Sequence, residues 1–174
     1  TPKGQRLEFV DAVATPTISF KWPGARGFSK ESVTNGMLGV ALSVGKDSFD
    51  DRLVVQQGVA SQAGGYWEDR ELGGIFTLTV SAAQGVSAEK LEQEARKAIM
   101  DMQKQGFSEE TLKIVRTEIE TGYDSVPSNP LGLAINLTQS AQNGDARAWK
   151  REVELAKTVT PEDVSKAFRA LDVD

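Results

Sequence analysis

The sequence predicts an α+β fold in which helices pack on one face of a mixed, mostly antiparallel sheet. Segments with the alternating pattern of strands are confined to the first half of the chain, and amphipathic helical patterns dominate the second half. A short polar connection also joins two of the strand-like segments, as in a hairpin. Early strands followed by late helices favour helices gathered on one side of the sheet.

The length and composition fit a single domain spanning residues 1–174. The chain has 174 residues, of which 39% are hydrophobic, which is enough for a core of ordinary size. It begins at Thr1 and ends at Asp174. We therefore expect a domain excised from a longer protein.

The first half is expected to contain the strands and two helices. The strand segments are 7–10, 17–23, 59–67 and 75–82. Ser29 is a typical N-cap for a helix over 30–44, and a short helix is expected over 50–57. Gly36 and Gly39 either weaken the longer helix or allow it to pack closely against another element.

The second half is expected to be helical. The predicted helices are 88–105, one that begins after Ser108 and is interrupted by Pro127, 131–142, 145–156, and a last helix from Pro161. The last helix starts with Thr160-Pro161-Glu162-Asp163, which combines a cap, a proline in the first turn and an acidic residue at the third position.

The composition excludes several classes of function. The chain has no histidine and no cysteine, so it lacks the usual nitrogen and sulfur ligands of zinc and cannot form a Ser-His-Asp or Cys-His site. Its net charge of −5 disfavours nucleic acid and anionic membranes as partners. The glutamates between 109 and 120 are expected to form a solvated helical face. The aspartates between 47 and 51 lack the ligand spacing of a calcium loop.

Two adjacent aromatic residues lie in the predicted hairpin. Tyr66 and Trp67 point to opposite faces of their strand, so one of them must be partly exposed or lie under another segment. An exposed aromatic beside glycines is a candidate contact for a partner or a peptide, and simple packing is the alternative.

The order and spacing of several segments resemble a known family. The matching segments are the strand at 17–23, the helix at 31–44 with Asp51-Arg52-Leu53, the segments 53–66 and 74–80, Phe107-Ser108-Glu109-Glu110, the segment 131–141, Trp149, and 159–164. Together they resemble the second, non-metal half of the inverzincin zinc peptidases, the family of pitrilysin, insulin-degrading enzyme and mitochondrial processing peptidase. The resemblance covers nearly the whole chain, but the family's final strand, which would follow Leu171, is expected to be missing or trimmed in this sequence.

The resemblance implies a non-catalytic, peptidase-like half-domain of a bacterial zinc metalloprotease. It would pair with an H-x-x-E-H domain, in the same chain or in a partner subunit, and enclose a peptide-binding chamber. Zinc is expected in that partner domain, with no metal, cofactor or catalytic residue in this one. We favour the periplasm over the cytoplasm as its compartment.

The resemblance also points to candidate substrate contacts. Active members often carry an arginine and a tyrosine seven residues apart, and the aligned positions here are Val54 and Ser61. The family binds peptide by adding it to a sheet edge as a strand. Around the aligned serine, Gly64 and Gly65 would allow close backbone approach, and Tyr66 follows them. The alternative is a glycine bulge that binds no ligand.

Two other functions stay open at this point. The chain could be a structural subunit, like the non-catalytic core subunits of respiratory complexes that share this fold. It could also be an unrelated α+β module that binds a small molecule.

Overall fold

Three antiparallel strands form the sheet. The computed structural model describes residues 4–27, 29–70, 72–142, 145–146 and 148–173. The strands are β1 (Thr17–Pro23), β2 (Ala60–Glu68) and β3 (Ile75–Ala82), in the spatial order β1-β3-β2. Both pairings are antiparallel, so the α+β prediction is confirmed with a sheet that is wholly antiparallel in the described residues.

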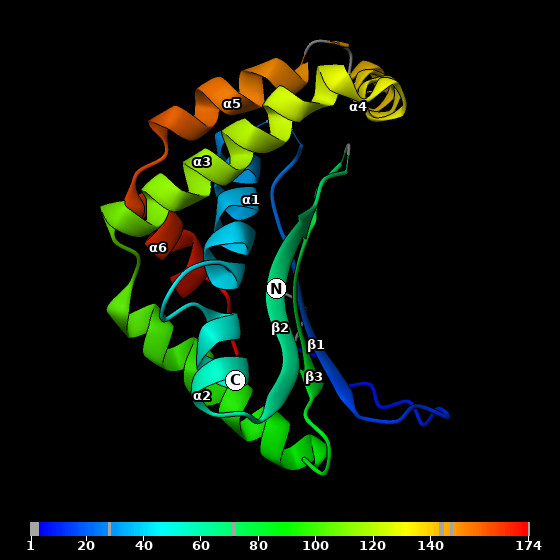
Figure 1. Ribbon diagram of the computed structural model, residues 1–174, viewed down its shortest axis with the longest axis vertical. Coiled ribbons are helices and arrows are strands. Elements are labelled where there is room, and N and C mark those ends of the chain that lie inside the picture. Colours follow the sequence, from blue (N-terminus) through cyan, green and yellow to red (C-terminus); the bar gives the residue numbers. More distant parts are fainter. Residues whose placement is uncertain (1–3, 28, 71, 143–144, 147, 174) are drawn as a thin grey trace.

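Helices cover one face of this sheet (Figure 1). They are α1 (Lys30–Ser43), the π-helix η1 (Asp51–Gln56), α2 (Ala88–Gln105), α3 (Glu109–Ser125), the 3-10 turn η2 (Val126–Ser128), α4 (Pro130–Gln142), α5 (Ala148–Thr158) and α6 (Pro161–Arg169). A bilayer-spanning segment is not found among the helices of the described residues. α1 packs mainly on β2, and α2 packs on β1 and β3.

The helix starts are where the capping residues predict them. The side chains of Ser29, Ser87, Ser108 and Thr160 each accept a hydrogen bond from a backbone N–H in the first turn of the helix that follows. At α6 the Asp163 carboxylate also accepts from the Thr160 backbone N–H, which completes a capping box. α5 differs from its prediction because it begins at Ala148 rather than at 145, after a turn closed by a hydrogen bond from the Ala148 N–H to the Asp145 carbonyl.

The predicted strand at 7–10 is wrong. Residues 7–10 have an extended, unpaired backbone, and Leu7, Phe9 and Val10 are 73%, 84% and 98% exposed. An alternating pattern produces a strand only where a second strand supplies hydrogen-bond partners, and the described part of this chain supplies none to this segment. We call residues 5–13 the N-terminal arm.

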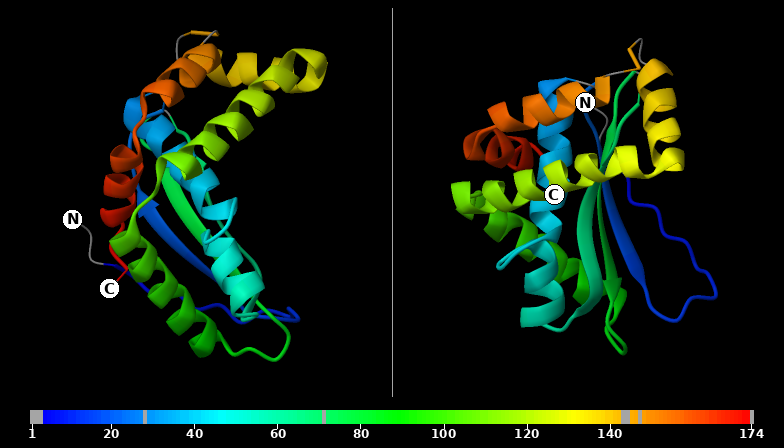
Figure 2. Two further views of the ribbon diagram at one scale, coloured as in Figure 1. Left: turned by 60° about the vertical axis from the view of Figure 1, so that its left-hand side comes forward. Right: turned by 45° about the horizontal axis from the view of Figure 1, so that its top comes forward.

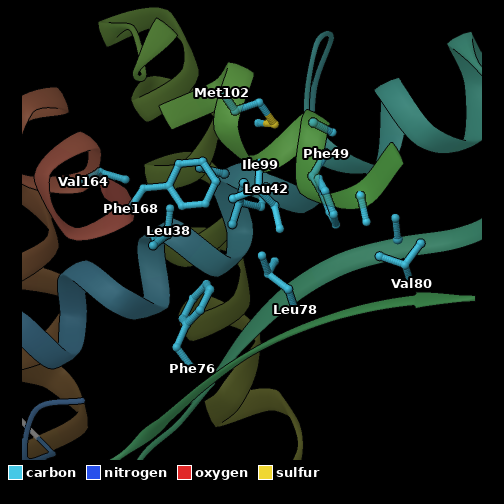
Figure 3. Packing of buried hydrophobic residues seen from close by; sticks show 14 of the residues in the cluster. Leu38, Leu42, Phe49, Phe76, Leu78, Val80, Ile99, Met102, Val164 and Phe168 are labelled. Atoms are coloured by element: carbon cyan, nitrogen blue, oxygen red, sulfur yellow. The ribbon is translucent and has the colours of Figure 1, made fainter. Parts of the chain in front are cut away.

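The core lies between the sheet and the helices (Figure 3). Side chains that alternate along β3 (Phe76, Leu78 and Val80) point toward the helices, as the sequence predicts. They meet the buried faces of α1, α2 and α6, which contribute Leu38, Leu42, Ile99, Met102, Val164 and Phe168. Folding removes this apolar layer between the helices and the sheet from water. Its burial is the main contribution to the stability of the fold.

Helix α1 lies close to β2 at Gly39. A Cβ atom added to Gly39 of α1 would lie 3.0 Å from the carbonyl oxygen of Gly65 in β2 and 3.1 Å from the Cα of Tyr66. By contrast, a Cβ on Gly36 would meet no atom within 4 Å. The sequence allows two roles for Gly36 and Gly39, weakening of the helix or close packing. Close packing applies to Gly39, whereas Gly36 has no such packing constraint.

Candidate functional site

The face of the sheet that points away from the helices is lined mainly with neutral polar side chains, together with the cationic Lys21. Three cross-strand rows run over it: Thr17–Ser81–Gln62, Ser19–Thr79–Gly64 and Lys21–Thr77–Tyr66. Neighbouring hydroxyls pair directly, because Thr17 Oγ1 lies 3.0 Å from Ser81 Oγ, and Ser19 Oγ lies 3.3 Å from Thr79 Oγ1. We call these three rows the hydroxyl face.

The hydroxyl face offers hydrogen bonds but no acid–base pair. Its titratable side chains are Lys21 and Tyr66, with Glu68 one row beyond them. Across the described residues, no group of three or more histidine, cysteine, aspartate or glutamate side chains is placed to hold a metal ion. This surface can therefore contact a polar chain such as a peptide backbone, since hydroxyls both donate and accept hydrogen bonds.

Tyr66 and Trp67 lie on opposite faces, as predicted. Tyr66 is 51% exposed and belongs to the hydroxyl face, next to Thr77. Trp67 packs against the core on the helix side, and its Nε1–H donates to Asp69 Oδ1 at 2.5 Å and to Ser32 Oγ at 3.1 Å. The exposed aromatic is thus the tyrosine, and the tryptophan has a structural role.

The two positions aligned with the arginine and tyrosine of active members lie near the start of β2. Ser61 is the extra residue of a β-bulge, because Ala60 pairs with Ala82 while Gln62 already pairs with Ser81. Its hydroxyl donates to the Ala82 carbonyl at 3.2 Å. Val54 belongs to η1 and packs partly against the core. Neither side chain can supply a positive charge.

Side chains from α1 and its following segment cover the outer edge of β2. The backbone N–H of Ala63 donates to Asp50 Oδ1 at 3.1 Å, and that of Gly65 donates to Ser43 Oγ at 3.3 Å. The glycine at 65 also has no room for a side chain, since its Cβ would lie 3.0 Å from Leu78 Cδ2. Adding a peptide strand at this edge would require displacing both side chains.

A second polar cluster lies among the helices, and the sequence gives no sign of it. Tyr123 of α3 donates a hydrogen bond from its hydroxyl to Glu152 Oε2 of α5. Burial raises the pKa of Glu152, the hydrogen bond from Tyr123 opposes the rise, and the negative charge of Asp69 adds to it. Burial also raises the pKa of Tyr123, with Glu152 as the second cause. These residues occupy ordinary helical positions, so only the fold brings them together.

Replacing Glu152 with glutamine is expected to stabilise the domain at alkaline pH. A folded-state pKa above the unfolded value means that native Glu152 favours its protonated form, so its contribution to stability is lost as the pH rises through the folded pKa. Glu152→Gln keeps an acceptor for Tyr123 and removes the ionisation. We expect its Tm to exceed that of the wild type by about 2–4 °C at pH 8, about 1 kcal/mol, and the difference to vanish near pH 4.5.

The matched control for this prediction is Glu154→Gln in the same helix. The Glu154 side chain is 72% exposed and pairs with Lys157 at the surface, so its change should leave the pH profile of Tm unaltered. Thermal melts by circular dichroism between pH 4.5 and 8 measure both variants. An equal pH profile for Glu152→Gln and the wild type would show that Glu152 ionises as freely as a surface carboxyl.

Comparisons with solved structures show what this arrangement is similar to. The inactive peptidase domain of a candidate zinc protease from Bordetella parapertussis superposes with a TM-score of 0.80 at 18% identity, over 94% of this chain and 90% of that one. A protease from Helicobacter pylori gives a TM-score of 0.81 at 16% identity, over 91% of this chain and 38% of that one. A chain of Complex III2 from Candida albicans gives 0.68 at 10% identity, over 92% and 41%.

No protein-family model matches the sequence, and no curated protein is significantly similar to it. At these identities the structural matches establish the fold. The chain spans less than half of the Helicobacter and Candida chains but nearly all of the Bordetella domain. Of the alternative module that binds a small molecule, these matches contradict only the unrelated fold. The chain has the fold of the inactive half-domain of the M16, or pitrilysin-type, zinc peptidases.

Proposed function

We propose that this chain is the non-catalytic half of a zinc metalloprotease and that it pairs with an H-x-x-E-H domain to enclose a peptide-binding chamber. The observation that carries the proposal is the superposition on an inactive peptidase domain over nearly the full length of both chains. A partner domain is supported by the greater length of the Helicobacter protease, of which this chain covers 38%. Zinc and the general base would belong to that partner domain.

The hydroxyl face is the surface that we assign to the chamber. It is the face of the sheet that the helices leave uncovered, and its threonines and serines other than the buried Thr77 suit a solvated wall along which a peptide can lie. Each of the two hydroxyl pairs keeps further hydrogen-bond positions for water, and a dry protein interface would leave those positions unpaired, which opposes a tightly packed contact there.

The sequence offers five candidate substrate contacts: Val54, Ser61, Gly64, Gly65 and Tyr66. Of these, the geometry favours Tyr66. It is half exposed on the hydroxyl face, and an aromatic ring with a hydroxyl can pack against a peptide and hydrogen-bond to it. The backbone N–H of Gly65 already donates to Ser43, and the Ser61 hydroxyl to a carbonyl of β3. We therefore propose contact through the face of β2 and not through its outer edge.

Two measurements on the isolated chain test the absence of catalysis. Calorimetric titration with zinc and hydrolysis of a quenched fluorescent peptide should both give no signal above buffer. Stoichiometric tight zinc binding, or peptide hydrolysis by this chain alone, would contradict the proposal.

The pairing is tested in the full-length parent protein together with its H-x-x-E-H domain. There, Tyr66→Ala is expected to raise KM about fivefold, the equivalent of about 1 kcal/mol of peptide binding, while the zinc content stays unchanged. Tyr66→Phe keeps the ring and serves as the matched control, with a smaller change. An unchanged KM in Tyr66→Ala would remove this face from the substrate path.

A purely structural role is the second candidate. The observation that favours it is the same fold in a chain of Complex III2 from Candida albicans. In that case the chain would purify in a stable assembly, and the assembly would contain no peptidase activity that depends on zinc.

A further inference from the structure

Lys21 carries the positive charge of the hydroxyl face, and the described residues supply no counter-ion to it. It lies in β1, is exposed, and takes part in none of the ion pairs found among the described residues. The next residue, Trp22, points to the helix side, where its Nε1–H donates to the Asp172 carbonyl at 2.6 Å. The contact that ties the end of the described chain to β1 is therefore on the face opposite Lys21.

The row that starts at Lys21 ends at a second hydrogen-bond donor. It runs through Thr77 to Tyr66. Thr77 is 1% exposed, so neighbouring side chains cover it, whereas Tyr66 is half exposed at the far end of the row. One strand separates Lys21 from Tyr66, which places their backbones about 10 Å apart at the usual strand spacing. Both side chains are long, so the ammonium group and the phenolic hydroxyl can reach a single small group above Thr77.

The surroundings leave the charge of Lys21 uncompensated. Glu68 lies one row beyond it, but the Glu68 carboxylate pairs with Arg70 at 2.7 Å. The N-terminal arm is held to α2 by an ion pair between Arg6 and Glu92 at 2.7 Å. Helices α1, α2 and α6 lie in front of the strands in the left view of Figure 2, so the sheet separates their carboxylates from this face.

We propose that Lys21 and Tyr66 form a subsite for a carboxylate of the peptide substrate. The ammonium group contributes charge and three N–H donors, and the phenol contributes one directional O–H donor. A basic side chain at the same place would be repelled by Lys21. The inference rests on the proposed function and deepens it, because it names the charge that the substrate carries at one place on the hydroxyl face.

The subsite is open to water, which limits its contribution to affinity. An exposed ion pair changes binding only about two- to fivefold, and dissolved salt screens it. Lys21 would therefore select among substrates, with the hydroxyls around it contributing the same contacts to every peptide.

The test uses the full-length parent protein with its H-x-x-E-H domain and a set of quenched fluorescent peptides. A peptide of neutral residues is changed one position at a time to Asp, Asn or Lys, and its C-terminus is either free or amidated. For the wild type, Asp at the position above the subsite should lower KM about two- to fivefold relative to Asn, and Lys should raise it. If the gain instead requires a free C-terminus, the bound carboxylate is that of the chain end.

Variants of both subsite residues test the assignment. Lys21→Gln should abolish the difference between the Asp and Asn peptides, and Lys21→Glu should reverse the preference in favour of Lys, both with an unchanged Tm because the side chain is exposed. Tyr66→Phe should weaken the preference without reversing it. Lys113→Glu makes the same change of charge on the exposed side of α3 and is the matched control, with wild-type selectivity. Raising the salt from about 0.05 M to about 1 M should suppress the preference of the wild type.

Three results would overturn the inference. If Lys21→Gln impairs hydrolysis of the Asp, Asn and Lys peptides alike, then Lys21 serves the fold or the pairing of the two halves. If the wild type shows no preference for a carboxylate at any position while Tyr66→Ala still raises KM, then the inference fails and the proposed function stands. A parent protein without zinc-dependent hydrolysis would overturn both.

Discussion

Replacing Gly39 with alanine is expected to destabilise the domain by about 1–3 kcal/mol. The added Cβ would lie 3.0 Å from the carbonyl oxygen of Gly65 and 3.1 Å from the Cα of Tyr66. Both neighbours are backbone atoms of β2, so no side chain can rotate to make room. Either α1 must shift away from the sheet or β2 must bend, and both changes loosen the packing of the core.

The same substitution at Gly36 is the matched control, with the opposite sign. Gly36 lies in the interior of α1, and an added Cβ would meet no atom within 4 Å. Gly36→Ala should therefore stabilise the domain by up to about 1 kcal/mol through helix propensity alone. Urea denaturation followed by circular dichroism measures both variants. Equal effects of the two substitutions would show that α1 and β2 are not in close contact in solution.

Replacing Leu78 with alanine is expected to cost about 2–5 kcal/mol, the largest effect that we predict for a single substitution. Leu78 lies in β3, the central strand, and is fully buried beneath α1 (Figure 3). Its removal leaves a cavity lined by atoms from the sheet and from α1, which the neighbouring strands hold in place. Since domains of this size are stable by only about 5–15 kcal/mol, the variant should be close to unfolding at moderate temperature.

Leu72→Ala provides the control within the same hairpin. Leu72 lies in the connection between β2 and β3 and is 89% exposed. Its loss should change the free energy of unfolding by no more than about 0.5 kcal/mol. If the two leucine variants unfold at the same urea concentration, then Leu78 is not a core residue in solution.

Local patterns in the sequence predict most elements of this fold. The caps at Ser29, Ser87, Ser108 and Thr160 identify helix starts because a short polar side chain there satisfies a backbone N–H that has no other partner. The alternation in β1 and β3 identifies the buried face of the sheet in the same way. These signals are local, so they can be read without knowing the fold.

The features that the sequence does not predict depend on contacts between distant segments. Residues 7–10 have a strand pattern, but whether they pair depends on an edge elsewhere. Gly39 and Gly36 look alike in sequence, and only the position of β2 distinguishes them. The contact between Tyr123 and Glu152 likewise has no local signal, because each residue fits a common helical pattern.

The candidate site is predicted in part. The opposite orientations of Tyr66 and Trp67 follow from strand geometry and are confirmed. Which of the two is exposed depends on where α1 packs, and the covering of the β2 edge by Ser43 and Asp50 depends on the path of the chain after α1. The contacts of Val54, Ser61, Gly64 and Gly65 with a substrate stay predictions.

The hydroxyls that make up most of the hydroxyl face have a consequence for selectivity. A hydroxyl hydrogen rotates about its C–O bond, so each threonine or serine can present a donor to one residue of a passing peptide and an acceptor to the next. Apart from the position of Lys21, which favours an acidic side chain over a basic one, such a wall does not distinguish one amino acid from another. If the hydroxyl face lines the chamber proposed above, most of the choice of cleavage sequence would therefore fall to the zinc-bearing half.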